Sequence, residues 1–177
     1  MIVGIPFDTF IVIHVLITFV AIGSGFPVVF SLVGSHRLPK TTAVFWLFTV
    51  LTSITGFMFF LSPAQAKVIT PALLTGFIAT VVFLFGLIAL YVKHLYGAWR
   101  WIYVVSTAIS LYLNVFVLIT QTFQKIKLVN PGAPMIGPPF APPTDFQFAV
   151  AQGAALVIFL MLGIIGVIKF RRGPGLA

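Results

Sequence analysis

The sequence predicts an all-α, polytopic transmembrane bundle that crosses the membrane five times and forms a single domain over residues 1–177. Hydrophobic residues make up 60% of the chain and charged residues only 7%, whereas a soluble domain carries about 25% charged residues. The apolar residues form runs that are long enough to cross a bilayer as helices. The basic residues stand singly or in pairs at the ends of these runs, where they set the topology of membrane proteins.

Short polar or proline-containing segments separate the apolar runs and give the bounds of the predicted helices. The five spans are expected at residues 9–34, 41–61, 69–94, 100–125 and 145–170. Residues 128–144, between the last two spans, are so rich in proline that they cannot form a regular helix. This segment is either an ordered, extended strap outside the membrane, which we expect, or a flexible lid.

The basic residues also predict how the chain is oriented. One side of the membrane receives seven of them, namely Arg37, Lys40, Lys93, Arg100, Lys169, Arg171 and Arg172, and the other side receives Lys67, Lys125 and Lys127. Because cytoplasmic loops are enriched in Lys and Arg, the N-terminus is predicted outside and the C-terminus in the cytoplasm. The proline-rich loop 128–144 then lies on the outer side.

The fourth predicted span is the one around which we expect the others to be arranged. At about 100° per residue, its polar side chains fall within an arc of roughly 60°. These side chains are Tyr103, Thr107, Ser110, Asn114 and Gln121. An amide near the middle of a membrane must find a hydrogen-bond partner, because lipid supplies none. The stripe is therefore predicted to face other helices.

Several function classes are disfavoured by composition. The basic residues form no stripe or module that would bind nucleic acid. The absence of cysteine excludes disulfides, thiolate metal sites and covalently attached c-type haem. Asp8 and Asp145 are the only acidic residues and lie at membrane edges, so no hydrolytic constellation is predicted. A transporter usually has charged residues at the membrane centre or an internal repeat, and the sequence shows neither. A transporter of lipids or small molecules is therefore kept only as a second alternative.

The candidate binding site is a set of intramembrane polar residues in the outer half of the bundle. It consists of His14, Asn114, Gln121 and Gln152. Buried polar groups in a membrane are costly and often functional, so these residues could line a pocket for a quinol, a lipid or another amphiphile. They could equally form a structural hydrogen-bond network.

Haem b is a further alternative, since two imidazoles at the same depth can ligate it. His14 has no histidine partner on the outer side. On the inner side His36 and His94 lie at the ends of the first and third spans, where they are weak haem candidates and also ordinary interfacial residues. We predict no bound cofactor and leave the metal content unknown.

The runs GAWRWIYVVSTAISLYLNVFVLITQTFQKI, HVLITFVAIGSG and TTAVFWLFTVLTSITGF resemble segments of small bacterial inner-membrane proteins whose activity is not known. The resemblance implies a multi-pass protein of the bacterial inner, or cytoplasmic, membrane. The chain is also faintly similar to cytochrome b561-type bundles, but the paired intramembrane histidines of that pattern are missing.

The sequence thus favours a non-catalytic accessory subunit of a larger energy-transducing or other membrane complex. Its partners would be the lipid bilayer and other membrane subunits, without nucleic acid. The alternative is a small redox protein that interacts with a quinol or with haem b.

Overall fold

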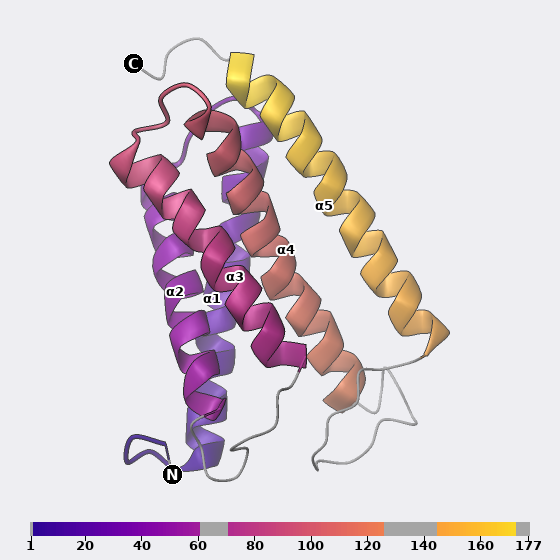
Figure 1. Cartoon of the computed structure of the whole chain (residues 1–177). Helices are drawn as coiled ribbons and strands as arrows, with labels where there is room; N and C mark the ends of the chain where they lie inside the picture. Colours follow the sequence, from indigo (N-terminus) through magenta and orange to yellow (C-terminus); the bar gives the residue numbers. More distant parts are fainter. Residues whose placement is uncertain (1, 61–70, 126–144, 173–177) are drawn as a thin grey trace.

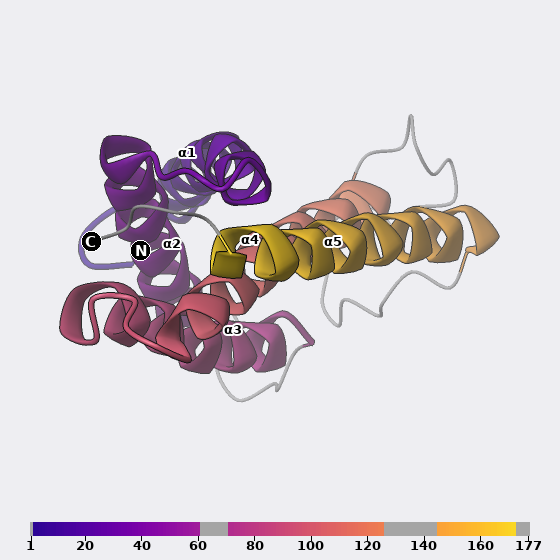
Figure 2. The same ribbon diagram turned by 90° about the horizontal axis from the view of Figure 1, so that it is seen from above.

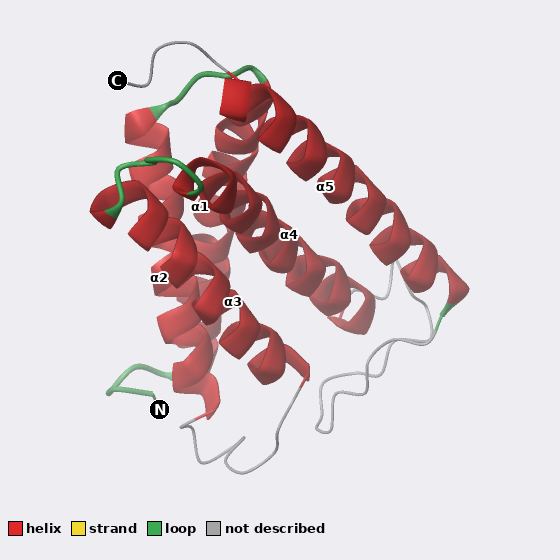
Figure 3. Ribbon diagram, turned by 45° about the horizontal axis from the view of Figure 1, so that its top comes forward, coloured by secondary structure: helices red, strands yellow, loops and turns green. Residues whose placement is uncertain are grey.

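The structure is a computed structural model that describes residues 2–60, 71–125 and 145–172 (Figure 1). Its helices are α1 (Phe7–Val33), α2 (Pro39–Phe60), α3 (Pro71–Leu87), the π-helix η1 (Ile88–Val92), α4 (Trp99–Lys125) and α5 (Phe146–Arg172). Within the described ranges the chain consists of helices and the segments that connect them, and it contains no β-strand (Figure 3). The predicted proline-rich loop 128–144 lies outside the described residues.

Five helical segments are long and apolar enough to cross a membrane, as predicted. They are Phe7–Val33, Pro39–Phe59, Leu73–Val92, Trp99–Gln124 and Phe146–Phe170. Their exposed surfaces carry large apolar side chains along most of their length, which is the surface that lipid tails cover. The chain is therefore an integral, multi-pass membrane protein with an all-α fold.

The third span ends in a π-helical turn, which the sequence did not predict. In η1 the Lys93 amide donates to the Ile88 carbonyl over 2.9 Å, and the Leu95 amide donates to Ala89, also over 2.9 Å. His94 and Leu95 then adopt left-handed φ angles of 46° and 60°. This wide turn ends the helix without a glycine or proline within η1 and directs the chain into α4.

The first four helices form a closed ring, and α5 lies outside it. In the ring α1 contacts α2, α2 contacts α3, α3 contacts α4, and α4 contacts α1. The fifth helix packs on α4 and α1 (Figure 2). Because α2 and α4 are opposite members of the ring, their inward faces meet across its centre.

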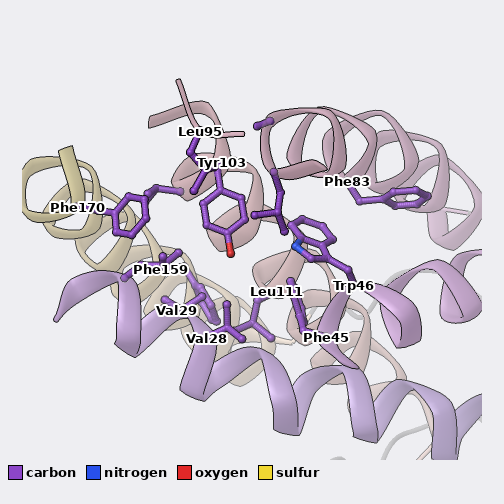
Figure 4. Close-up of a cluster of buried hydrophobic side chains, with 14 of the residues drawn as sticks. Val28, Val29, Phe45, Trp46, Phe83, Leu95, Tyr103, Leu111, Phe159 and Phe170 are labelled. Carbon is purple, nitrogen blue, oxygen red and sulfur yellow. The ribbon is translucent and has the colours of Figure 1, made fainter. Parts of the chain in front are cut away.

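The central element is α4, as the periodicity of its polar residues predicted. Over an 18-residue apolar stretch of each span, buried residues make up 44% in α4, against 17–28% in the other four. Leu111 on its inner half packs against Gly25 of α1 and Phe45 of α2. Two turns earlier on the same side, Val104 faces Gly166 of α5. Figure 4 shows these helices contributing to one buried apolar cluster.

Most of the described basic residues gather at one end of the bundle, and Lys125, the last residue of α4, lies at the other end. The α1–α2 connection, the η1–α4 connection and the last turn of α5 all lie at the end with most of the basic residues, and the N-terminus lies at the opposite end (Figure 1). Lys93 stacks its ammonium over the Trp99 ring at 5.7 Å, an arrangement suited to a membrane–water interface. We call this the basic end.

Candidate functional site

The centre of the ring contains buried polar atoms without partners. Five side chains carry them, none more than 8% exposed. The atoms are Trp46 Nε1 and Thr49 Oγ1 on α2, and Tyr103 OH, Ser110 Oγ and Asn114 Nδ2 on α4, and none has a hydrogen-bond partner among the described residues. We call these five residues the polar seam.

Helix geometry brings the two halves of the polar seam face to face. Around α4, Leu111 marks the side of α1 and Ser106 marks the side of α3, where its Cβ lies close to Gly86. The α4 stripe points between these two sides, toward α2. On α2, Trp46 and Thr49 share one face. Figure 4 shows the Tyr103 hydroxyl and the Trp46 indole nitrogen turned toward the middle of the bundle.

The polar seam is energetically expensive, because its polar atoms are buried without hydrogen-bond partners in the described part of the chain. A buried donor or acceptor without a partner costs about 1–3 kcal/mol, and native proteins leave few such groups unsatisfied. The Trp46 N–H and the Asn114 amide nitrogen are donors, while the three hydroxyls both donate and accept. The N–H groups of the seam thus need acceptors, and its hydroxyls can take either role.

At the basic end the seam approaches a charged group. Thr42 and Thr107 lie beside the Tyr103 hydroxyl, although neither meets the distance and angle of a hydrogen bond to it, and the Arg37 guanidinium is within electrostatic range. The Thr107 hydroxyl donates to its own helix, to the Tyr103 carbonyl. Arg37 Nε is also buried and has no acceptor in the described part of the chain.

His14 lies inside the bundle on α1 and is held by α2. Its Nδ1 is 2.7 Å from Thr55 Oγ1, and the Thr55 hydroxyl donates to the Leu51 carbonyl at 2.7 Å. Because Thr55 has a single hydroxyl proton, it accepts from His14 Nδ1–H, which fixes the tautomer of the neutral ring. The Phe59 ring meets the imidazole edge-on at 5.2 Å.

One turn further along, α1 and α2 approach through a second pair of polar side chains. Thr18 Oγ1 donates to the His14 carbonyl over 2.9 Å and lies 3.5 Å from Thr52 Oγ1. Thr18 uses its proton on His14, so Thr52 is the donor between the two hydroxyls. We call His14, Thr55, Thr18 and Thr52 the hydroxyl ladder.

Two of the predicted site residues, Asn114 and Gln121, lie on the same polar stripe of α4. They are two helical turns apart on the same face of α4, and Gln121 Oε1 is buried without a described partner. The C-terminal half of α4 runs toward the same end of the bundle as the N-terminal half of α1 (Figure 1). His14 and Gln121 therefore lie toward the same end.

Gln152 is placed elsewhere, between α4 and α5. Its Nε2 donates to the Phe116 carbonyl at 3.0 Å and to Thr120 Oγ1 at 3.1 Å. Phe116 lies about 200° around α4 from Asn114, so Gln152 faces the side of α4 that is turned away from the seam. The structure thus places Asn114 and Gln121 on one face of α4 and Gln152 on another, and it pairs His14 with Thr55 of α2.

The two histidines considered for haem lie at the basic end on separate connections. His36 and His94 are both exposed, and His36 Nδ1 is 3.4 Å from the Gly34 carbonyl. The described residues contain no group of three or more His, Cys, Asp or Glu that could hold a metal ion. Haem ligation by His36 and His94 stays an untested alternative.

Sequence analysis missed Trp46 as a site residue. It singled out Tyr103 only as part of the α4 stripe. The available signal was spacing, since Trp46 follows Thr42 by four residues and precedes Thr49 by three, which places its N–H on the polar face.

The bond between α1 and α2 at His14 can be tested by an isosteric substitution. Thr55→Val removes the acceptor of a half-buried hydrogen bond, so we expect a loss of about 1 kcal/mol in the free energy of unfolding. The measurement is chemical unfolding in mixed micelles followed by circular dichroism. Ser24→Ala is the matched control, because the Ser24 hydroxyl bonds only within its own helix, to Val20 and Ala21. Equal stability of Thr55→Val and the parent protein would contradict the assignment.

Comparison of the chain with protein-family models, with curated proteins and with solved structures finds no match. The functional inference therefore depends on the geometry of the site.

Proposed function

We propose that the protein binds a small amphiphile of the quinone class inside the membrane, on the α4 stripe between Asn114 and Gln121. The observation that carries this proposal is the pair of buried, unpartnered amide atoms on one face of α4, a donor at Asn114 Nδ2 and an acceptor at Gln121 Oε1. A quinone carbonyl accepts a hydrogen bond, and a quinol hydroxyl donates one.

His14 adds chemistry to this half of the bundle. Its neutral imidazole is oriented by Thr55, and a neutral imidazole presents one donor and one acceptor nitrogen. The surrounding apolar and aromatic side chains, such as Phe59, suit a hydrophobic ring. Pockets for small ligands commonly combine an apolar lining with a few convergent polar groups.

The test uses the fluorescence of the tryptophans, because quinones quench indoles at short range. Titration of the purified protein with decylubiquinone is expected to give saturable quenching that Asn114→Leu abolishes. Gln152→Leu is the control, since Gln152 bonds to the opposite side of α4. Linear, non-saturable quenching, or equal quenching of the Asn114→Leu variant, would refute the proposal.

A second candidate function is that of an accessory subunit in a larger membrane complex, and α5 favours it. This helix lies outside the ring, and only 17% of the residues in an 18-residue apolar stretch of it are buried. Its outward surface includes Gly153, where an added Cβ would meet no atom within 4 Å. A peripheral helix with an open face is a suitable contact for another membrane subunit.

This candidate predicts that a bulky residue on α5 displaces a partner without unfolding the protein. Gly153→Phe should lose the proteins that co-purify in gentle detergent, as identified by mass spectrometry. Ala43→Phe, at an exposed position of α2, should keep them. If the parent protein purifies alone from native membranes, the subunit function is wrong.

The proposed location is the bacterial inner membrane with the basic end in the cytoplasm. The gathering of Arg37, Lys40, Lys93, Arg100 and Lys169 at one end supports this orientation. Green fluorescent protein fused to the C-terminus should then fluoresce, because it folds in the cytoplasm. A dark fusion that is exported intact would reverse the orientation.

A further inference from the structure

The basic end carries positive charge that no acidic side chain of the protein balances. Its described basic side chains are Arg37, Lys40, Lys93, Arg100 and Lys169. The sequence contains only two acidic side chains, Asp8 in the first turn of α1 and Asp145 directly before α5. Both lie at the opposite end of the bundle, because α1 and α5 finish at the basic end (Figure 1). An anion from outside the chain is therefore the favoured counter-charge.

Two helix N-termini add to this positive charge. Both α2 and α4 begin at the basic end (Figure 1), and the N-terminus of a helix carries a partial positive charge that acidic side chains commonly balance. Neither helix has an acidic residue in its first turn. Each has a basic residue there instead, Lys40 in α2 and Arg100 in α4. This reversal of the usual pattern strengthens the attraction for an anion.

Arg37 is the basic side chain that the bundle holds in place. It is half-buried, and its Nε is enclosed without a hydrogen-bond acceptor among the described residues. Its guanidinium is within electrostatic range of the Tyr103 hydroxyl on α4, which lies beside Thr42 of α2. The two terminal Nη atoms are not enclosed, and within the described ranges no residue forms a hydrogen bond or ion pair with them. The guanidinium is therefore fixed from the inside, while its outer edge is accessible.

The aromatic side chains of the η1–α4 connection and of the first turn of α4 mark the depth of this end in the membrane. Tyr96 and Trp101 are exposed, and Trp99 lies under the Lys93 ammonium. Tyrosine and tryptophan concentrate at the level of the lipid headgroups. The anions present at that depth are the phosphate groups of lipids.

We propose that the basic end binds the phosphate of an anionic phospholipid at Arg37, with Lys40 and Arg100 adding to the attraction. A guanidinium donates two parallel, charge-assisted hydrogen bonds to a phosphate, here through its two Nη atoms. A zwitterionic lipid fits less well, because its own cation adds to a positive charge that is already unbalanced. The site lies at the opposite end of the α4 stripe from Gln121, so it does not depend on the binding of a quinone.

The test is native mass spectrometry of the purified, delipidated protein in a non-ionic detergent, with phosphatidylglycerol and phosphatidylcholine offered in equal amounts. We expect the protein to retain phosphatidylglycerol preferentially. Arg37→Lys keeps the charge but loses the bidentate contact, so it is expected to weaken phosphatidylglycerol binding about tenfold. Lys169→Gln is the control, because Lys169 is exposed on α5 outside the ring, and the loss of one such charge should weaken binding by at most about fivefold.

Equal retention of the two lipids by the parent protein would overturn the proposal, as would equal binding of phosphatidylglycerol by Arg37→Lys and the parent. Inorganic phosphate at millimolar concentration should leave the lipid bound. Its displacement by phosphate would assign the site to a free anion instead, and retention of an acidic protein through Arg37 in place of lipid would also refute the proposal.

The thermal stability of the parent protein gives a second measurement that needs no substitution. Phosphatidylglycerol should raise the melting temperature and phosphatidylcholine should not, because a ligand that binds only the folded protein stabilises it. Equal shifts with the two lipids, or no shift with either, would contradict the proposal.

Discussion

Replacement of Trp46 by alanine is expected to lower the free energy of unfolding by about 3–5 kcal/mol, the range for removing a buried aromatic side chain. The indole is buried at the ring centre and packs against Phe45, with ring centroids 4.9 Å apart. It also lies over Gly86 of α3. Removing it leaves a cavity that touches two of the four ring helices. Chemical unfolding in mixed micelles measures the loss.

Trp101→Ala is the control for the Trp46 substitution. The Trp101 side chain lies on α4 but is 43% exposed, so its removal leaves no cavity. We expect a change of less than about 0.5 kcal/mol, as for surface substitutions generally. If both tryptophan variants lost the same stability, the placement of Trp46 at the bundle centre would be wrong.

Gly25→Ala is expected to destabilise the bundle by about 1–3 kcal/mol through overpacking. A Cβ at this position would come within 2.6 Å of Leu111 Cδ1 and 2.9 Å of the Phe45 ring. Both neighbours are fully buried, so neither has free space into which it can move. The ring would have to widen where α1, α2 and α4 meet. The measurement is thermal unfolding in detergent.

Gly163→Ala provides the matched comparison, because its Cβ would meet the Ala108 Cβ at an ordinary 3.7 Å. At this position alanine restricts the unfolded chain without a clash, and we expect a gain of up to about 1 kcal/mol. The two substitutions therefore shift the melting temperature in opposite directions. A loss of stability in Gly163→Ala as large as that in Gly25→Ala would show that helix packing does not cause the effect.

The five spans and the central position of α4 were predictable because both depend on local features of the chain. A run of apolar residues commits a segment to the membrane whatever its neighbours are. The arc that contains Tyr103, Ser110 and Asn114 shows which face of α4 meets protein. Both predictions are confirmed by the structure.

The composition of the site was less predictable, because it depends on which helices are neighbours. Helical periodicity shows which face of α5 carries Gln152. It does not show that α5 approaches α4 from the side opposite Asn114. The facing of Trp46 and Tyr103 likewise requires that α2 and α4 be diagonal members of the ring. The π-turn of η1 has no sequence signal of its own, since Ile88–Val92 contains only residues that are common in α-helices.

The closed ring of α1 to α4 has a consequence for how the protein is made. Helices enter the membrane in order during synthesis, and every contact that closes the ring exists once α4 has left the ribosome and the insertion machinery. The fifth helix is inserted after the four-helix ring has formed, and it then packs against the outer surfaces of α1 and α4. Biogenesis is therefore expected to pass through a four-helix stage, and a ribosome paused before α5 should already hold a protease-resistant nascent chain.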